Sequence, residues 1–185
     1  MRAVVLVEGL SDRNALEALA ERRGHDLTAE GVTIEPIGGA QAVGRFLERY
    51  GPHGLDVRLA GLYDVGEEGA VKRCLERAGL GSDLARADME RLGFYACVED
   101  LEDELIRSLG VEAVEEVVAA QGELRSFRVL QRQPAQRGLP VEKQLRRFMG
   151  THSGRKIHYA RLLVEALDPA RVPRPLELAL SHVLQ

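Results

Sequence analysis

Four consecutive aliphatic residues, from Val4 to Val7, lead directly into Glu8 and Gly9. Because no polar residue interrupts this run, the pattern predicts a strand that is buried on both faces, as in a parallel sheet. Glu8 then stands at the carboxyl end of that strand. Open α/β sheets bind their ligands at this edge, so an acidic side chain placed there is a candidate for a functional site.

Strand and helix patterns alternate over the first two-thirds of the chain, which is typical of a parallel sheet built from βα units. Further strands are expected at residues 32–37, 57–63 and 94–98. Pro36 has no amide hydrogen to donate to a ladder, so the strand at 32–37 is expected at an edge of the sheet.

The last third of the chain is expected to be helical. Glycine or proline separates three helical patterns, at residues 140–149, 155–167 and 175–184. We therefore predict an α/β domain over residues 1–120, with about four mainly parallel strands flanked by helices. A basic helical extension over residues 121–185 is expected to pack on it.

The net charge of −4 conceals two regions of opposite sign. Residues 1–120 contain 13 Lys and Arg against 24 Asp and Glu, a charge of −11, whereas residues 121–161 contain 10 against 2, a charge of +8. This pattern is expected of a protein that handles polyanions while its acidic half holds cations. Charged helix surfaces that only contact solvent are the alternative explanation.

Membrane and disulfide-stabilised classes are not favoured. No stretch is long and apolar enough to cross a bilayer, and the first residues show no signal region, so a cytoplasmic protein is expected. Cys74 and Cys97 are too few and too far apart to indicate a disulfide framework or a zinc site.

Acidic residues follow three of the predicted strands, namely Glu8, then Asp64, then Asp100 with Glu102. Parallel strands place their carboxyl ends along one edge of a sheet, so these side chains are expected to converge. Neighbouring carboxylates repel each other unless a cation neutralises them, and a site of oxygen ligands suits Mg²⁺ or Mn²⁺ rather than zinc. Such metals are typical of phosphoryl transfer.

Simpler explanations exist for single acids. Asp12 suits a helix N-cap, and Asp100 and Glu102 complement the dipole of a following helix. Neither explanation accounts for Glu8 or Asp64, which directly end apolar runs. The acids are therefore more informative as a group than singly.

These motifs resemble the Toprim domain that topoisomerases, primases, RecR and the nucleases of the overcoming lysogenization defect (OLD) class share. Glu8-Gly9 matches the Glu-Gly motif of that domain, and Asp64-Val65-Gly66 matches its Asp-x-Asp motif only in part. Gly66 stands where the second acid belongs, and Glu67 is the nearest substitute.

The OLD-type branch of the family is matched more specifically. It adds an acid after the Glu-Gly motif, here Asp12, and a later Asp-Leu-Glu, here Asp100-Leu101-Glu102. The whole chain is also similar to small stand-alone Toprim proteins. The resemblance implies a Rossmann-like Toprim fold and a site for one or two Mg²⁺ or Mn²⁺ ions. The metal residues that it implies are Glu8, Asp12, Asp64, Glu67, Asp100 and Glu102.

The resemblance also implies catalytic roles for Glu8 and for Lys156, whose ammonium would stabilise charge at the phosphate. An ion pair between Lys156 and the acidic domain is the alternative. No Walker-type motif occurs and the ATPase domain of OLD nucleases has no counterpart, so no ATP dependence is expected. A second copy of the chain or an ATPase supplied in trans are the protein partners to expect.

Basic residues of two successive helices are expected to contact nucleic-acid phosphates. The predicted nucleic-acid-binding residues are Arg146, Arg147, Arg155, Lys156 and Arg161. DNA is the expected partner, with RNA left open. Such contacts give salt-sensitive affinity with little base preference.

The sequence thus favours a metal-dependent nucleic-acid phosphodiesterase, a nuclease with endonuclease or exonuclease action left open. The alternative is a non-catalytic Toprim module that binds DNA or a protein partner in repair or recombination. A receiver-like phosphotransfer domain also gathers acids at strand ends, but it has no use for the Glu-Gly turn or for the basic tail.

Overall fold

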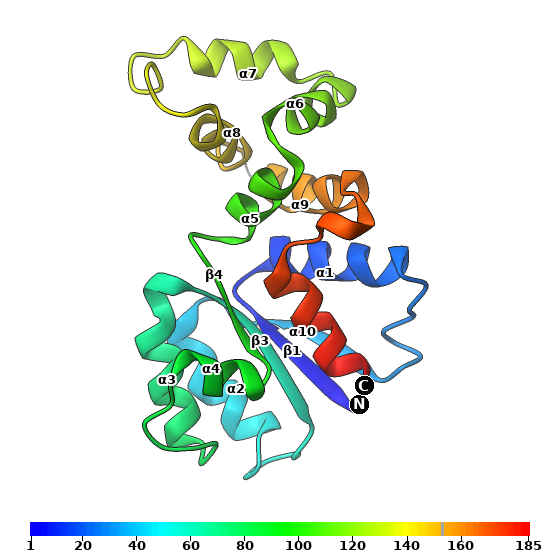
Figure 1. Ribbon diagram of the computed structural model, residues 1–185, viewed down its shortest axis with the longest axis vertical. Helices are drawn as coiled ribbons and strands as arrows, with labels where there is room; N and C mark the ends of the chain where they lie inside the picture. The colour runs from blue at the N-terminus through cyan, green and yellow to red at the C-terminus, as the bar shows by residue number, and fades with distance from the viewer. Residues whose placement is uncertain (153) are drawn as a thin grey trace.

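A parallel four-stranded sheet forms the centre of the molecule (Figure 1). The computed structural model describes residues 1–152 and 154–185. The strands are β1 (Ala3–Val7), β2 (Val32–Pro36), β3 (Arg58–Asp64) and β4 (Phe94–Cys97), and they lie in the order β2-β1-β3-β4. All neighbouring pairs are parallel. The four predicted strands are confirmed to within one residue at each end, and β2 is an edge strand as Pro36 predicts.

Strand β1 is buried along its whole length, as an apolar run without alternation requires. Ala3, Val5 and Val7 belong to the apolar core on one face of the sheet. Val4 and Leu6 belong to the core on the other face. The sheet is therefore the middle layer of an α/β sandwich, which confirms the predicted fold class.

Helices cover both faces of the sheet (Figure 1). One face carries α1 (Leu10–Arg22) and α10 (Arg174–Leu184), and the other carries α2 (Val43–Tyr50), α3 (Glu68–Arg77) and α4 (Arg86–Arg91). Single 3₁₀ turns, η1 (Ala40–Ala42) and η2 (Val65–Glu67), precede α2 and α3. Helix α4 is short and has no counterpart among the predicted elements.

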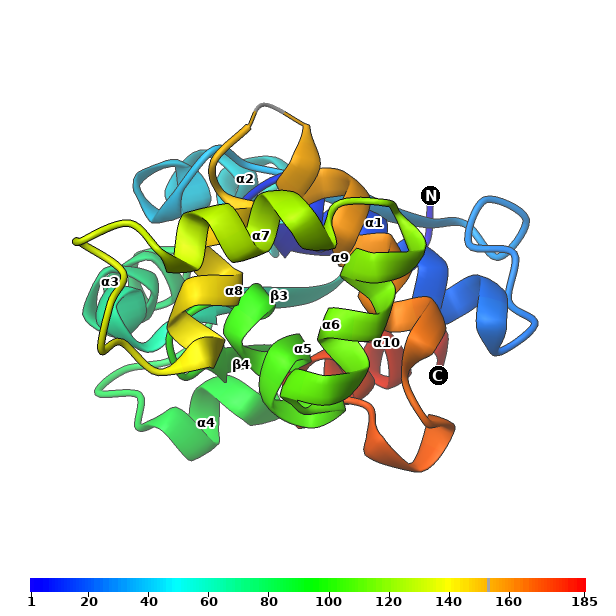
Figure 2. The same cartoon turned by 90° about the horizontal axis from the view of Figure 1, so that it is seen from above.

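The remaining helices stand beyond the carboxyl ends of the strands (Figures 1 and 2). They are α5 (Leu101–Leu109), α6 (Val111–Ala120), α7 (Leu124–Gln131), α8 (Val141–Met149) and α9 (Arg155–Ala166), followed by the 3₁₀ turn η3 (Pro169–Arg171). Helix α9 packs along α1, and α5 contacts both α8 and α9. This layer brings the basic helices over the edge of the sheet at which the predicted acids end.

The last helix returns to the sheet. Helix α10 contacts β3, β4 and β1, so the carboxyl-terminal end of the predicted extension completes one face of the α/β sandwich. The division of the chain near residue 120 remains a prediction. Among the described residues, no helix combines the length and the hydrophobicity that crossing a membrane requires.

Candidate metal centre

The parallel sheet brings the acids of three strands to one edge. Glu8 follows β1 directly, and Asp64 is the last residue of β3. Asp64 is in register with Cys97 at the end of β4, three residues before Asp100. The convergence that the sequence predicts at the carboxyl edge is therefore present in the fold.

Asp12 lies in the first turn of α1, directly beside this edge. Its Oδ2 atom accepts a hydrogen bond from the backbone N–H of Gly9 at 2.7 Å. Burial raises the pKa of Asp12 to about 7, and repulsion from Glu102 and Glu8 adds to the effect. The Gly9 hydrogen bond and Lys156 oppose the rise. Asp12 is thus a helix-capping residue and also a member of the acidic cluster.

Asp64 is repelled by several of the same acids. Burial raises the pKa of Asp64 to about 7, and the charges of Glu8, Asp100 and Glu67 raise it further. Burial and Glu8 also raise the pKa of Glu67, and these two glutamates line one small cavity. Glu67 therefore lies near the position at which the second acid of the Asp-x-Asp motif is missing.

The missing acid would find room in this fold. A Cβ atom added at Gly66 meets no atom within 4 Å, and the backbone of Gly66 is not in the left-handed region. The glycine is therefore not required by packing. Its effect is to leave out one carboxylate beside Asp64.

Glu102 is the most deeply buried acid of the cluster, with 1% of its surface exposed. The Lys156 ammonium forms an ion pair with its Oε2 atom at 2.9 Å, but neither carboxylate oxygen has a hydrogen bond of regular geometry in the described structure. Burial raises the pKa of Glu102, and Lys156 lowers it. A buried carboxylate with an unpartnered oxygen is a costly arrangement unless a further cation contacts it.

Asp100 uses both of its oxygens. As the N-cap of α5, it accepts the backbone N–H of Asp103 at Oδ1, at 2.9 Å. Its Oδ2 accepts Arg146 Nε at 2.7 Å, and the same guanidinium also pairs with Glu99. The sequence predicts Asp100 as a metal ligand and Arg146 as a phosphate contact. In the structure these two side chains form an ion pair with each other.

A groove of about 370 Å³ extends from the acids to α8 and α9. It is lined by Glu99, Asp100, Glu102, Lys143, Arg146, Arg147, Gly150 and Lys156. Three predicted nucleic-acid-binding residues, Arg146, Arg147 and Lys156, therefore face the same space as two predicted metal residues. Within the described part of the chain, Arg147 and Lys143 form no ion pair, which leaves their charges available to an external anion.

Two of the predicted nucleic-acid-binding residues do not line this groove. Arg155 is only 12% exposed, pairs with Glu123 at 2.7 Å and lies over the Phe148 ring. Arg161 pairs with Glu21 of α1 and with Glu165. The charges of both arginines are thus engaged by acids of the protein, which distinguishes them from Arg147 and Lys143.

Lys143 and Glu99 line the groove and were not predicted. Lys143 and Arg147 are four residues apart on α8, so they share one face of the helix, and Gly150 is its C-cap. Helical spacing from Arg147 is therefore the signal that would have identified Lys143. Glu99 offers no such signal, since it precedes the helix cap and is half exposed.

The acids do not form a ready metal site. Among residues 1–152 and 154–185, no group of three His, Cys, Asp or Glu side chains is close enough to hold an ion as it stands. The residues nevertheless fit a hard cation, because the donors are carboxylates and Glu102 has an unpartnered buried oxygen. Burial is the main cause of the raised pKa values of Asp12 and Asp64, and the charges of Glu8 and other neighbouring acids add to it.

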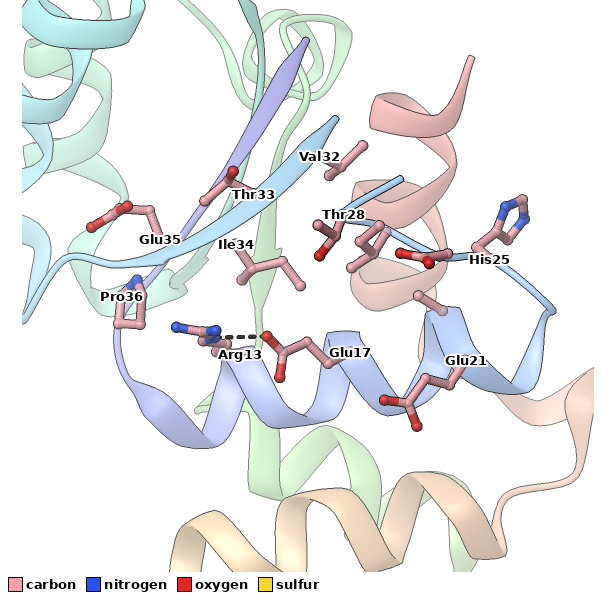
Figure 3. Close-up of a pocket in the computed structure, with 13 residues that line it drawn as sticks. Arg13, Glu17, Glu21, His25, Thr28, Val32, Thr33, Ile34, Glu35 and Pro36 are labelled. Carbon is pink, nitrogen blue, oxygen red and sulfur yellow. Dashed lines mark hydrogen bonds and ion pairs between the residues drawn. The ribbon is translucent and has the colours of Figure 1, made fainter. Parts of the chain in front are cut away.

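A second cavity, of about 550 Å³, lies between α1 and the edge strand β2 (Figure 3). Figure 3 shows the Arg13–Glu17 ion pair of α1 facing Ile34 and Pro36 of β2. None of the predicted site residues lines this cavity. The predicted metal-binding acids therefore lie at the carboxyl edge of the sheet and not in this second cavity.

A parallel α/β sheet with an acid after its first strand and another at the end of its third is the arrangement that the predicted Toprim-type fold requires. Residues 1–65 match the family described as "Overcoming lysogenization defect protein-like, TOPRIM domain". This family match spans β1 to β3 and ends before Asp100 and Glu102. Comparison with curated proteins found no match.

Solved structures extend the similarity of fold to almost the whole chain. The C-terminal region of the Xanthomonas campestris pv. campestris OLD protein is 23% identical, and the match covers 99% of this chain and 92% of that one, with a TM-score of 0.74. The C-terminal region of the Burkholderia pseudomallei OLD protein is 19% identical, with coverage of 99% and 97% and a TM-score of 0.74. The helical layer beyond the sheet is thus part of the fold that these regions share.

Proposed function

We propose that this protein is a metal-dependent nucleic-acid phosphodiesterase that acts on DNA. The observation that carries the proposal is Glu102, a buried carboxylate that lines the basic groove. Its Oε2 atom pairs with Lys156, and its Oε1 atom has no partner in the described structure. The OLD-like Toprim match supports it, since Toprim domains generally bind Mg²⁺ through acidic residues.

The carboxyl edge of the sheet supplies the groups for one or two Mg²⁺ or Mn²⁺ ions. The residues that would hold them are Glu8, Asp12, Asp64, Asp100 and Glu102, with Glu67 in place of the acid missing at Gly66. When bound, the metal would polarise a phosphate and lower the pKa of a water molecule. Hard cations suit this donor set because it contains only oxygen ligands.

The basic residues of the groove bind and orient the substrate. Lys156 is half exposed, so its ammonium can face a phosphate while it neutralises Glu102. Lys143 and Arg147 contact phosphates of the backbone and carry no base specificity. This division predicts binding that weakens as salt rises.

The proposal is tested by cleavage of supercoiled plasmid DNA in the presence of Mn²⁺. The wild-type protein should nick or degrade the plasmid, and Glu8→Ala should not. Glu17→Ala is the matched control, because Glu17 pairs with Arg13 on α1 and lies outside the acidic cluster. Equal activity in Glu8→Ala would assign the cleavage to a contaminant and reject the proposal.

The second candidate is a non-catalytic module that binds DNA or a protein. Gly66 in place of the second acid favours it, as does the lack of a ready metal group among the described residues. DNA binding without metal, together with no cleavage under any divalent cation, would select this candidate. Competition by RNA of the same sequence tests the preference for DNA, and light scattering tests for a second copy.

A further inference from the structure

Arg146 occupies a position at which the acids and the bases of the groove meet. We propose that Arg146 neutralises Asp100 in the metal-free protein and moves to a nucleic-acid phosphate when the acidic edge binds a divalent cation. The arginine would then couple the binding of the two ligands. This inference rests on the proposed function, because it concerns the same site.

The contact between Arg146 and Asp100 is direct. Arg146 donates through Nε to Asp100 Oδ2 at 2.7 Å, and a second guanidinium nitrogen lies 2.7 Å from the same oxygen. The other oxygen of Asp100 accepts the backbone N–H of Asp103. A cation that uses Oδ2 as a ligand therefore has to replace the guanidinium, while the helix cap at Oδ1 can stay in place.

The side chain of Arg146 is placed to change partners. It is 36% exposed and lines the groove together with Arg147 and Lys143. A guanidinium binds a phosphate with the same paired donors that it uses for a carboxylate. Release from Asp100 and Glu99 would thus add a third positive charge to the part of the groove that holds Lys143 and Arg147.

The Lys156–Glu102 pair differs in this respect. Glu102 is almost fully buried, so departure of the ammonium would leave a carboxylate without solvent or a partner. Asp100 is 16% exposed and keeps a backbone donor, so it can exchange one cation for another. The exchange is therefore assigned to Arg146.

Coupling of this kind is reciprocal. If a cation raises the affinity for DNA by a given factor, DNA raises the affinity for the cation by the same factor. The protein would then hold metal weakly until nucleic acid is bound. Replacing Arg146 by a neutral residue should remove the coupling and leave the metal site open at all times.

Calorimetric titration with Mg²⁺ tests the first half of the inference. Arg146→Gln should bind Mg²⁺ about fivefold more tightly than the wild type, the factor expected for loss of a competing ion pair of moderate strength. Arg147→Gln is the matched control, because it removes the same charge from the same groove without touching Asp100. It should change the affinity less than about twofold.

Binding of a short DNA duplex with and without Ca²⁺ tests the second half. Arg147→Gln should bind DNA more weakly than the wild type, but the cation should raise the DNA affinity of both about fivefold, and Arg146→Gln should lose this gain. If Arg146→Gln and Arg147→Gln both bind Mg²⁺ more tightly than the wild type by the same factor, the cause is the general loss of positive charge, and the inference is overturned. If the wild type binds Mg²⁺ and Arg146→Gln binds it with the same affinity, the inference alone is overturned. If neither the wild type nor Arg146→Gln binds Mg²⁺, the proposed function is overturned as well.

A purely structural role for the ion pair has a different signature. It would lower the Tm of Arg146→Gln, while the Mg²⁺ affinity stayed at the wild-type value. Arg146→Lys provides a further check, because it keeps the charge but has no paired donors for Asp100. Its Mg²⁺ affinity should fall between those of the wild type and Arg146→Gln.

Discussion

Asp12→Asn should stabilise the metal-free protein above neutral pH and leave its stability unchanged in acid. Burial, with repulsion from Glu102 and Glu8, raises the pKa of Asp12 from 3.8 to about 7. The folded protein therefore binds a proton that the unfolded chain releases between about pH 4 and pH 7, and the free energy of unfolding falls as pH rises through this window. Above about pH 7, Asp12 is ionised in both the folded and the unfolded state, so its destabilising effect on the folded state no longer changes with pH.

The size of the effect follows from the same pKa. A change from 3.8 to about 7 corresponds to ~4 kcal/mol at about 1.4 kcal/mol per pH unit. Rearrangement of the neighbouring side chains and entry of water reduce it, so we expect about 2 kcal/mol. In the wild type the Gly9 N–H donates to Asp12 Oδ2 at 2.7 Å. Asparagine keeps an oxygen that can accept this hydrogen bond, so the substitution removes only the charge.

Urea unfolding at about pH 8 and about pH 4, with and without Mg²⁺, measures this effect. At the higher pH Asp12→Asn should be more stable by about 2 kcal/mol, and at the lower pH the two proteins should coincide. Mg²⁺ should stabilise the wild type more than the variant, because it binds the folded state through the ionised group.

Asp26→Asn provides the control for this experiment. Asp26 also accepts a backbone N–H, that of Ala29 at 3.0 Å, but it is exposed. Because this side chain lies at the surface, Asp26→Asn should change the free energy of unfolding by less than about 0.5 kcal/mol at either pH. If Asp12→Asn is less stable than the wild type at high pH, or differs from it equally at both pH values, the electrostatic reasoning is refuted.

Three further predictions concern the same edge of the sheet. Gly66→Asp should increase the Mg²⁺ affinity several-fold in calorimetry, because a Cβ finds free space there, and Gly66→Asn should not. Lys156→Met should destabilise the protein by about 1–2 kcal/mol in urea unfolding at about pH 8. The effect should vanish in acid, because Glu102 is then protonated in the folded and unfolded states. Lys143→Gln should weaken DNA binding and lower its salt slope by about 1 in a fluorescence titration, whereas Arg161→Gln, whose charge is paired with acids of α1 and α9, should change neither.

The positions of Glu8 and Asp64 could be predicted because the information is local. The apolar run predicts where the strand lies, and the acid follows directly at the end of that run. The parallel pairing then follows from alternating strands and helices, and Pro36 indicates that the second strand lies at an edge, whereas the order of the other strands was not predicted. No long-range contact is needed for any of these steps.

The partners of the basic residues could not be predicted in the same way. Arg155 and Lys156 are adjacent in sequence, but neighbouring residues of a helix point about 100° apart. Only the packing of α9 against α5 and α6 decides that one meets Glu123 and the other Glu102. The choice depends on contacts across 32 and 54 residues of chain, which periodicity does not contain.

Asp100 illustrates a limit of a different kind. A helix cap and a metal ligand are both consistent with its sequence position, and the sequence offers them as alternatives. In the structure one oxygen makes the cap and the other meets Arg146, so the residue serves two purposes at once. A sequence pattern identifies the residue, but it does not show which carboxylate oxygen caps the helix and which one contacts another group.

The edge strand β2 also bears on how the protein avoids aggregation. An exposed strand edge is a template on which other chains can add strands. Here the amide of Val32 is already donated to Leu27 O at 2.8 Å, and Pro36 has no amide to offer. The Arg13–Glu17 pair lies beside the remaining part, so an incoming strand would desolvate charges. Unwanted growth of the sheet is thereby blocked at this edge without a covering helix.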